Sequence, residues 1–290
     1  MRQAAIETSH VNFHESYFHF NGFRLISSTA ITVHPVPAFQ DNYLWVIHND
    51  RQAAVVDPGD AAPVLAYLEA NHLQLAAIIC THHHADHVGG VEQLLDTLHL
   101  RGKIPVYGPA SERIPARSQA LREGDQITLP LLDLTFDVLD VPGHTAGHIA
   151  YVGHDMLFCG DTLFACGCGR LFEGTAEQMT ASLAKLKRLP PHTKVFCAHE
   201  YTMANIKFAE AVEPGNADLK LRKAFCAAKR HRNLPTVPST IHLELATNPF
   251  LRWDQPAVQA AAAARLKHAI GSTPAPALVF GAIREWKNNF

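Results

Sequence analysis

The stretch THHHADHVGG, residues 81–90, decides the fold, and it comes directly after the apolar run at residues 75–80. That run has the length and composition of a buried strand, and the glycine pair that closes the stretch precedes a helical pattern. Side chains two residues apart share a face of an extended chain, so His82 and His84 can hold one metal ion. The turn after them carries the following Asp–His pair toward a second ion. Imidazole and carboxylate ligands suit zinc and related first-row ions and leave positions open for water.

Three more histidines or aspartates follow apolar runs by one or a few residues. His144 lies in the segment PGHTAGH, Asp161 in GDT and His199 in AHE. One such residue is most simply a loop residue or a turn cap, but a set of them at strand-to-loop junctions can converge on one rim of a sheet and predicts a dinuclear metal site. The expected ligands are His82, His84, Asp86, His87, His144, Asp161 and His199. His83 lies on the other face and is not expected to be a ligand, and His148 is expected either to support the ligands or to be a structural residue.

The chain divides by pattern into three parts. Residues 1–30 mix aromatic, histidine and polar residues without a clear period, and no role is assigned to this extension. From residue 31 to about 200, strand-like runs alternate with helical patterns, which favours an α/β catalytic domain of mixed sheets. Residues 201–290 predict a small helical domain. Strands are expected at 43–48, 53–57, 75–80, 104–107, 134–141, 149–152, 156–159 and 194–198, helices at 62–71, 91–98, 175–188, 201–212, 216–231, 256–270 and 277–287, and a linker at 233–240.

Composition limits the partners of the chain. It has 290 residues, is 47% hydrophobic and carries a formal net charge of -2. It therefore has no broad basic field for nucleic acid or an anionic membrane, and no apolar run suited to span a membrane or to direct secretion. The six cysteines are spread along a chain far larger than disulfide-stapled domains, so we expect reduced thiols in a cytoplasmic protein. We expect this protein to be a monomer.

The metal-binding pattern carries a family resemblance. His82-x-His84-x-Asp86-His87, with the strand-end residues above, resembles the metallo-β-lactamase superfamily, and within it the chain is similar to glyoxalase II, the hydroxyacylglutathione hydrolase family. The resemblance covers about residues 31–290. The motifs that narrow it to this branch are GDTLF at 160–164, CGCGR at 166–170, EGT at 173–175, HEYT at 199–202 and NPFLR at 248–252. It implies an αβ/βα sandwich of two mixed sheets flanked by helices, followed by a glutathione-binding helical domain.

The resemblance also implies how the ligands divide. The two sets are His82, His84 and His144 for one divalent metal ion, and Asp86, His87 and His199 for the other. Asp161 would bridge the ions, because a shared carboxylate lowers the repulsion between cations about 3.5 to 4 Å apart. Asp57 would orient a ligand histidine by accepting its second N–H. Zinc is the expected metal, with iron and manganese as alternatives.

The implied reaction is hydrolysis of a glutathione thioester. A hydroxide held between the two metal ions, with Asp86 and Asp161 as the catalytic carboxylates, would attack the thioester carbonyl of S-(2-hydroxyacyl)glutathione. The expected substrate is S-D-lactoylglutathione, and its products are glutathione and D-lactate in the second step of methylglyoxal detoxification. The chain contains no Gly-x-Ser-x-Gly elbow, which disfavours a serine hydrolase.

The resemblance implies a cationic site for the glutathione carboxylates. Arg284 and Lys287 are three residues apart on an expected helix and match the Arg-x-x-Lys pair that holds the glycine carboxylate in the family. Tyr201 and Arg170 match residues that line the rest of the tripeptide site. Arg170 stands where many relatives have lysine, and Phe172 where some have tyrosine, so the chain lacks one hydroxyl contact and we expect weaker affinity.

Three alternative functions stay open at this point. One is a glutathione persulfide dioxygenase with a single iron, which the complete second ligand set disfavours. Another is a lactonase, a β-lactamase or a further hydrolase of the same fold. The third is a module that binds metal or glutathione without catalysis, which would predict a closed coordination shell.

Overall fold

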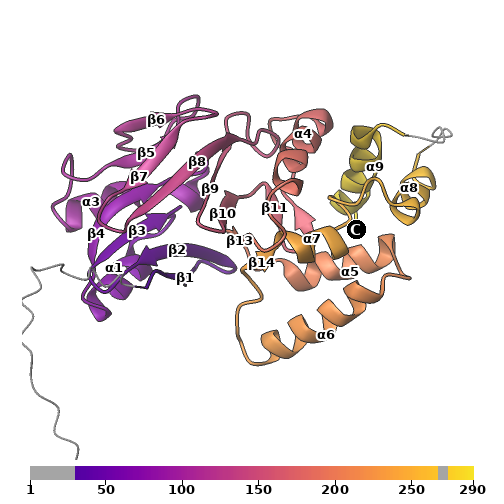
Figure 1. Ribbon diagram of the computed structural model, residues 1–290, viewed down its shortest axis with the longest axis horizontal. Coiled ribbons are helices and arrows are strands. Elements are labelled where there is room, and N and C mark those ends of the chain that lie inside the picture. Colours follow the sequence, from indigo (N-terminus) through magenta and orange to yellow (C-terminus); the bar gives the residue numbers. More distant parts are fainter. Residues whose placement is uncertain (1–29, 267–273) are drawn as a thin grey trace, which may run out of the picture. The chain divides into compact units, whose positions relative to one another are not determined.

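The computed structural model describes residues 30–266 and 274–290 (Figure 1). The expected extension at residues 1–30, apart from its last residue, lies outside the described residues, as does the end of the helix expected at 256–270. The chain from Ile31 to Phe290 forms one compact unit.

The first half of this unit is a six-stranded sheet with helices on one face. Its strands follow in sequence order: β1 (Thr32–Ala38), β2 (Asn42–His48), β3 (Gln52–Val56), β4 (Gln74–Ile79), β5 (Val106–Pro109) and β6 (Gln119–Leu121). The first three strands are antiparallel, and β3 to β6 run parallel. Parallel neighbours need a crossover connection. The helices of this half are α1 (Ala61–Ala70), α2 (Ala85–Val88) and α3 (Val91–Thr97).

A second six-stranded sheet packs against the first. Its order is β14-β13-β10-β9-β8-β7, and it is mixed because β10 and β13 are parallel while the other pairs are antiparallel. The strands are β7 (Gln126–Leu129), β8 (Leu134–Asp140), β9 (Ile149–Gly153), β10 (Met156–Gly160), β13 (Lys194–Cys197) and β14 (Ser239–Thr240). A small two-stranded sheet joins β11 (Leu163–Phe164) to β12 (Gly167–Cys168).

Strand β2 shows how the layers form. Its residues are apolar almost without interruption, because both faces of the strand are buried. Trp45 faces the second sheet, where its ring lies 5.0 Å from that of Phe196, while Val46 points the other way into the core beneath α1 and α3. On the outer side of the second sheet, α4 (Ala176–Lys187) buries Met179 and Leu183. The predicted αβ/βα sandwich is therefore confirmed.

The rest of the chain is helical. After β13 come α5 (Thr202–Val212), α6 (Ala217–His231), α7 (Ile241–Thr247), α8 (Pro256–Ala263) and α9 (Pro276–Asn288). Asn216 caps α6 by accepting from the backbone N–H of Leu219, which explains where that helix begins. The buried pair of Arg222 and Glu244 joins α6 to α7.

Several elements differ from the expectation. Strands β1, β6 and β7 were not among the expected strands. Strand β1 is an edge strand, where Pro35 and Pro37 are tolerated, and its first four residues are exposed or half-buried. The segment expected as a linker at 233–240 ends in β14, whose Thr240 pairs with Lys194 of β13. The helical part of the chain thus contributes a strand to the second sheet.

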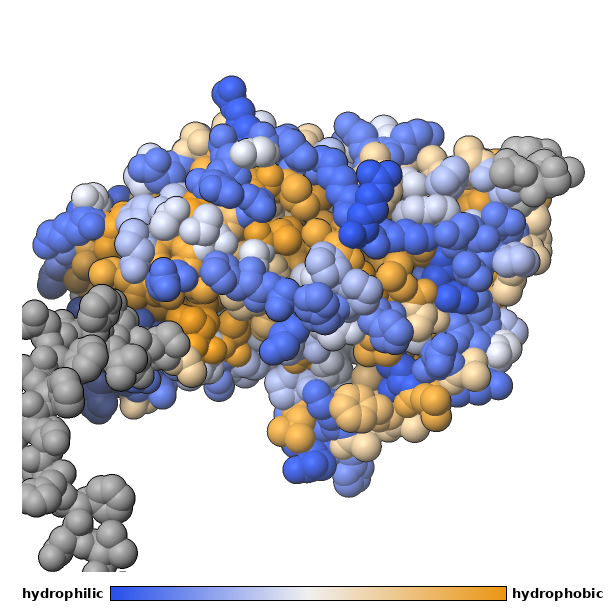
Figure 2. All heavy atoms as spheres, in the orientation of Figure 1, coloured by the Kyte–Doolittle hydropathy of each residue, from blue (hydrophilic) through white to orange (hydrophobic). Residues whose placement is uncertain are grey.

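Helix α6 is exposed along one stripe. Leu221 and Phe225 are 72% and 61% exposed, whereas Leu219, Arg222 and Cys226 face the rest of the chain. Figure 2 shows hydrophobic and hydrophilic side chains side by side over the part of the molecule where Figure 1 places α6. Across the described ranges, no helix has the length and apolarity needed to cross a membrane.

Candidate metal centre

The candidate site lies at the end of β4, where the chain turns into the short helix α2. Thr81 to His84 form the turn, and Asp86 and His87 lie on the helix. The loop after β3 packs directly on this helix: a Cβ atom added to Gly59 would lie 1.8 Å from the carbonyl oxygen of Asp86. Only glycine allows that approach, so the backbone itself fixes the position of α2.

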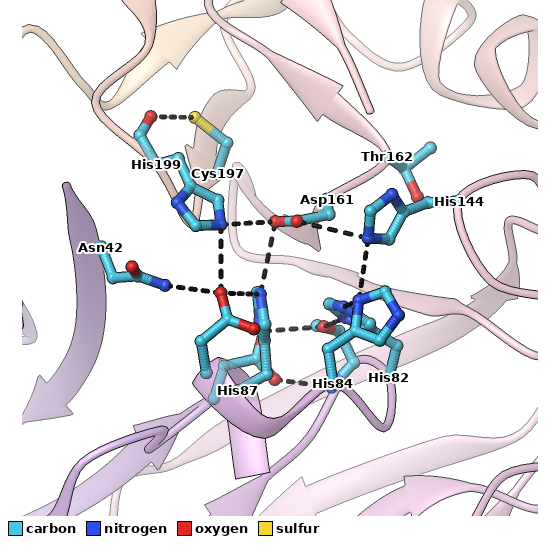
Figure 3. A network of polar contacts seen from close by, with 12 residues as sticks. Asn42, His82, His84, His87, His144, Asp161, Thr162, Cys197 and His199 are labelled. Carbon is cyan, nitrogen blue, oxygen red and sulfur yellow. Dashed lines mark hydrogen bonds and ion pairs between the residues drawn. The ribbon is translucent and has the colours of Figure 1, made fainter. Parts of the chain in front are cut away.

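Three histidines point their ring nitrogens at one place. His84 Nδ1 lies 3.1 Å from His82 Nε2 and 3.1 Å from His144 Nε2, as Figure 3 shows. A tetrahedral ion with metal–nitrogen bonds of about 2.0–2.1 Å would separate neighbouring donors by about 3.3 Å. The spacing of these three nitrogens therefore fits a single metal ion.

A second group of ligand atoms lies next to the first. Asp86 Oδ2 is 3.5 Å from His87 Nε2 and 3.6 Å from His199 Nε2. Asp161 lies between the two groups: its Oδ1 is 3.4 Å from His87 Nε2 and 3.3 Å from His199 Nε2, and its Oδ2 is 3.4 Å from His144 Nε2 (Figure 3). All seven expected ligands thus come together in the arrangement that the resemblance implies. Their role as ligands stays a prediction.

Two buried atoms support the fit to cations. Among the described residues, His87 Nε2 and Asp161 Oδ1 are buried without a hydrogen-bond partner. Buried polar atoms in native proteins are nearly always satisfied, and an unsatisfied one calls for an explanation such as an ion. A cation between them would satisfy both atoms.

The pKa shifts of the candidate ligands also fit metal binding. Burial lowers the pKa of His82 well below its usual value and also lowers that of His144, so these imidazoles are neutral and keep a lone pair for a metal. Burial alone would raise the pKa of Asp161, yet His87 and His199 hold it well below the ordinary range. Burial likewise works against a charged His87, but Asp161 and Asp57 raise its pKa well above normal. Metal binding there releases a proton.

Carboxylates outside the cluster hold its histidines. Asp57 Oδ2 accepts from His87 Nδ1 at 3.0 Å, the contact expected from the sequence. The carboxylate of Asp57 also accepts from the backbone N–H and the hydroxyl of Thr81, both at 2.7 Å. Asp41 does the same for His199, whose Nδ1 lies 2.8 Å from Asp41 Oδ1. These bonds leave the other ring nitrogen directed at the site.

Sequence reasoning missed Asp41 and its neighbour Asn42. Asn42 donates from its side-chain amide to Asp86 Oδ2 at 3.0 Å, so the two residues hold one candidate ligand each. The available signal was their position, directly before the strand that was expected at 43–48. Short polar residues at such a junction can serve a neighbouring site, but the sequence does not say that β1 and β2 reach this one.

The other two histidines of the motifs are not in either group of ligand atoms. His148 accepts from the backbone N–H of Asp161 at 3.2 Å, and its ring stacks on that of His82 at 4.5 Å. It therefore contacts the candidate ligands Asp161 and His82 without belonging to either group of ligand atoms. His83 lies against two carboxylates, with Nδ1 3.0 Å from Glu112 Oε2 and Nε2 3.4 Å from Glu173 Oε1.

A cavity of about 530 Å³ opens beside the metal centre. The expected substrate residues that line it are Arg170, Phe172, Tyr201, Arg284 and Lys287. Tyr201 and Arg284 also contact other residues of the protein. The ring of Tyr201 stacks on that of His199 at 4.7 Å, and Arg284 is buried and donates to the carbonyl oxygen of Cys168 at 3.0 Å. Burial, assisted by Arg284, lowers the pKa of Lys287 to about 8.

A larger cavity of about 740 Å³ lies at the opposite ends of β3 and β4. Its lining is mainly apolar, with Leu75, Leu100 and Leu129 among its residues. Metal chemistry needs converging ligands, and of the two cavities only the smaller one has them.

Two family descriptions match adjoining parts of the chain. Residues 38–199 match the family described as the metallo-beta-lactamase superfamily, and residues 200–290 match the one described as hydroxyacylglutathione hydrolase C-terminus. The hydroxyacylglutathione hydrolase of Cupriavidus taiwanensis is 58% identical over 270 residues, which cover 90% of this chain and 99% of the relative. The enzyme of the same name from Nitrosomonas eutropha is 54% identical, with the same coverage. The solved structure of TTHA1623 in a di-iron-bound form has a TM-score of 0.53 at 27% identity, covering 76% of this chain and 100% of that one.

Proposed function

Because the chain belongs to the metallo-β-lactamase superfamily and, within it, to the hydroxyacylglutathione hydrolase family, we propose that it hydrolyses S-(2-hydroxyacyl)glutathione thioesters with two divalent metal ions. S-D-lactoylglutathione is the proposed substrate, and glutathione and D-lactate are the products, which places the reaction as the second step of methylglyoxal detoxification. The observation that carries the proposal is the pair of ligand groups joined by Asp161 at the edge of a cavity with cationic side chains.

We propose two metal sites with one shared ligand. His82, His84 and His144 would hold the first ion. Asp86, His87 and His199 would hold the second, with the two oxygens of Asp161 directed one toward each site. Zinc is the proposed metal because imidazole and carboxylate ligands suit it, and the di-iron form of a related structure supports iron as the alternative.

The metal ions, when bound, would lower the pKa of a water molecule toward about 7 and polarise the thioester carbonyl. The protein's part is to keep the reacting groups in place. Asp57 and Asp41 fix the imidazoles of His87 and His199. The carboxylates of Asp86 and Asp161 can accept hydrogen bonds from the attacking water and orient it toward the carbonyl carbon.

The bond changes require little further acid catalysis. The water oxygen forms a bond to the carbonyl carbon, and the carbon–sulfur bond breaks to release the thiolate of glutathione. A thiol has a pKa of about 8.5, so the leaving thiolate needs little protonation near neutral pH. The proton lost by the water goes to a carboxylate of the site or to solvent.

Recognition of glutathione is proposed for the cationic end of the cavity. Lys287 and Arg170 both line it, and charged donors of this kind bind carboxylates. Arg284 lines it as well, while its bond to the carbonyl oxygen of Cys168 fixes the guanidinium in place. Tyr201 and Phe172 supply aromatic surface between the two ends of the cavity. Residues 201–290 would thus be the glutathione-binding domain, and residues 31–200 the catalytic domain.

We also propose a monomer that acts in the cytoplasm. One copy of the chain supplies every residue of the proposed site. Within the described part of the chain, all six cysteines are free and buried, which supports a reducing compartment.

The test is steady-state hydrolysis of S-D-lactoylglutathione beside other acyl-glutathiones, a lactone and a β-lactam, with metals quantified on the same sample. We expect the 2-hydroxyacyl thioester to be the preferred substrate, about two metal equivalents per chain, and loss of activity with a chelator that added zinc reverses. Faster hydrolysis of the lactone or the β-lactam, or full activity after chelation, would exclude the proposal. Oxygen uptake with glutathione persulfide would point to the dioxygenase instead.

A further inference from the structure

One histidine of the THHHADH motif has no place among the proposed ligands. We propose that His83 is a positioning residue: its imidazole joins Glu112 to Glu173, and the two carboxylates hold the turn at residues 143–147 so that His144 stays directed at the first metal site. This inference rests on the metal site of the proposed function.

The direction of His83 follows from its place in the motif. Neighbouring side chains in extended chain point to opposite sides, so His82 and His84 can face the metal site only if His83 faces away from it. On that other side lies the turn that follows β8 and carries His144. The motif therefore contacts this turn in two ways. His84 lies against His144, and His83 lies against the glutamates that bind the residues after it.

Glu112 is the buried half of this arrangement. Its Oε1 accepts from the hydroxyl of Thr145 and from the backbone N–H of Gly147, the latter at 3.0 Å. Its Oε2 has no hydrogen-bond partner among the described residues, and it lies 3.0 Å from His83 Nδ1 in a side chain that is only 4% exposed. A buried carboxylate oxygen is costly without a donor or a cation nearby. The ring of His83 is the polar group that lies beside this oxygen.

Glu173 is the exposed half. Its Oε2 accepts from the backbone N–H of Ala146 at 2.7 Å, and its Oε1 lies 3.4 Å from His83 Nε2. Together the two carboxylates bind three consecutive residues of the turn, directly after His144. The stretch 170–173, which carries Glu173, also contacts His144 directly. The Nδ1 of His144 lies 2.9 Å from the carbonyl oxygen of Arg170.

Close packing leaves this turn little freedom to compensate. A Cβ atom added to Gly147 would lie 2.6 Å from Cγ of Glu112, and one added to Gly174 would lie 2.6 Å from Cα of Gly143. The backbone of the turn thus touches both segments that carry the glutamates. A change in the side chain of Glu112 is therefore transmitted to the turn.

A rival role for His83 is as a ligand of a further ion. His83, His84 and Glu173 can each bring one ligand atom within 4.8 Å of the others. The geometry favours positioning, because both ring nitrogens of His83 face carboxylates and the Nδ1 of His84 faces the first metal site. The two roles differ in the number of ions that the protein binds.

The experiment compares His83→Ala, Glu112→Gln and the double variant with the wild type. Metal content and the rate of metal release to a chromogenic chelator are measured on the loaded proteins, along with kcat and KM. Residues that orient metal ligands typically affect metal affinity by about 10–100-fold. We expect each single variant to release one of its two ions about tenfold faster, with kcat about tenfold lower and KM little changed.

The double variant tests the connection. If His83 acts through Glu112, the double variant should release metal no faster than the more impaired single variant does. His83→Gln, whose amide can still donate to one carboxylate, should recover part of the loss. The matched control is His192→Ala, which removes an exposed histidine that lies 2.9 Å from Asp155 far along the chain from the motif, and it should behave as wild type.

The possible results separate the inference from the proposed function. Unchanged metal release in His83→Ala, or effects that add up in the double variant, would overturn the positioning role. A third ion in the wild type that His83→Ala loses would overturn it in favour of ligation. Faster metal release in variants of a protein that fails to cleave the thioester would sustain the positioning role and reject the proposed substrate. A wild type that holds no pair of ions would overturn both.

Discussion

The two ends of the active-site cavity are built differently. At the metal end, the candidate ligands His82, His87 and His199 are at most 4% exposed, and they lie just after β4, on α2 and just after β13. Between the ends, Phe172 is 63% and Tyr201 37% exposed, and at the cationic end Lys287 is a half-buried residue of α9. Chemistry at a metal depends on fixed ligand geometry, whereas recognition of a flexible tripeptide tolerates adjustable contacts. Substitutions should therefore act on turnover and metal content at one end and on KM at the other.

The largest effect is expected for Asp161→Ala. The substitution removes the carboxylate whose two oxygens face both groups of ligand atoms. Metal content should fall together with turnover, by about three orders of magnitude or more, because the acidification of water from a pKa of 15.7 to about 7 is lost. Metal analysis and kinetics on the same sample check this. Full activity with both ions retained would rule out a bridging role.

The next largest effects are expected at Asp57 and Asp41, whose carboxylates hold the candidate ligands His87 and His199. Asp57→Asn should lower metal affinity by about 10–100-fold, because the buried carboxylate orients His87. Asparagine also tolerates the positive φ of 49° at this position. Asp41→Asn should have a smaller effect, since the side chain of Asp41 is 37% exposed and water can replace part of its bond to His199. Competition titrations with a chelator measure both, and equal losses would contradict the role of burial.

At the cationic end, Lys287→Met should raise KM with little change in kcat. A hydrogen bond to a charged group contributes about 1.5–3 kcal/mol when fully formed, and partial exposure reduces this, so we expect about a tenfold rise. Methionine keeps the packing of the side chain near the ring of Phe208. Lys207→Met, which removes an exposed lysine that lies over the ring of Phe290, is the control. Reduced metal content in the Lys287 variant would show that the two ends are not independent.

The pH dependence of KM should show the same lysine. Burial disfavours the charged form, which lowers the pKa of Lys287 to about 8. The ammonium that binds a carboxylate is thus present below that pH and lost above it. KM should be constant below neutral pH and rise by about fivefold by about pH 9, and Lys287→Met should show no such rise. A rise that persists in the variant would assign it to another group.

The smallest change is expected for Phe172→Tyr. The ring lies against those of His84 and His144, at 5.8 and 5.1 Å between ring centroids, and lines the cavity. An added hydroxyl can supply the contact that some relatives have, which is worth about 0.5–1.5 kcal/mol. KM should fall about threefold at constant kcat. An unchanged KM would mean that this position does not contact glutathione.

The expectations from sequence were most accurate where the pattern is dense. The motif at residues 81–87, together with His144, Asp161 and His199, led to the two groups that the structure brings together. Strands β4 and β10, which precede the motif and Asp161, are largely buried and mainly apolar, so their signal is strong. Strands β1 and β14 were not predicted, because β1 contains two prolines and is mostly half-buried or exposed, and β14 is only two residues long.

Residues that act from outside the cluster were harder to find. Asp41 and Asn42 reach the site only because β1 and β2 pair and their turn lies beside His199. Glu112 and Glu173 are ordinary glutamates in sequence, and only packing brings them to the two sides of His83. Contacts between residues so far apart along the chain produce no pattern in the sequence around either residue.

The sequence by itself determined the ligand types, the spacing of the metal motif, the sandwich fold and the family, because each is written in residues close together or in runs of fixed period. Tertiary structure alone decided which carboxylate holds which histidine, and that His83 faces two glutamates. It also decided that the pKa of Lys287 falls to about 8, because that value depends on burial by distant helices. Hydrogen-bond partners and desolvation are properties of the packed chain, and neither exists until the segments have met.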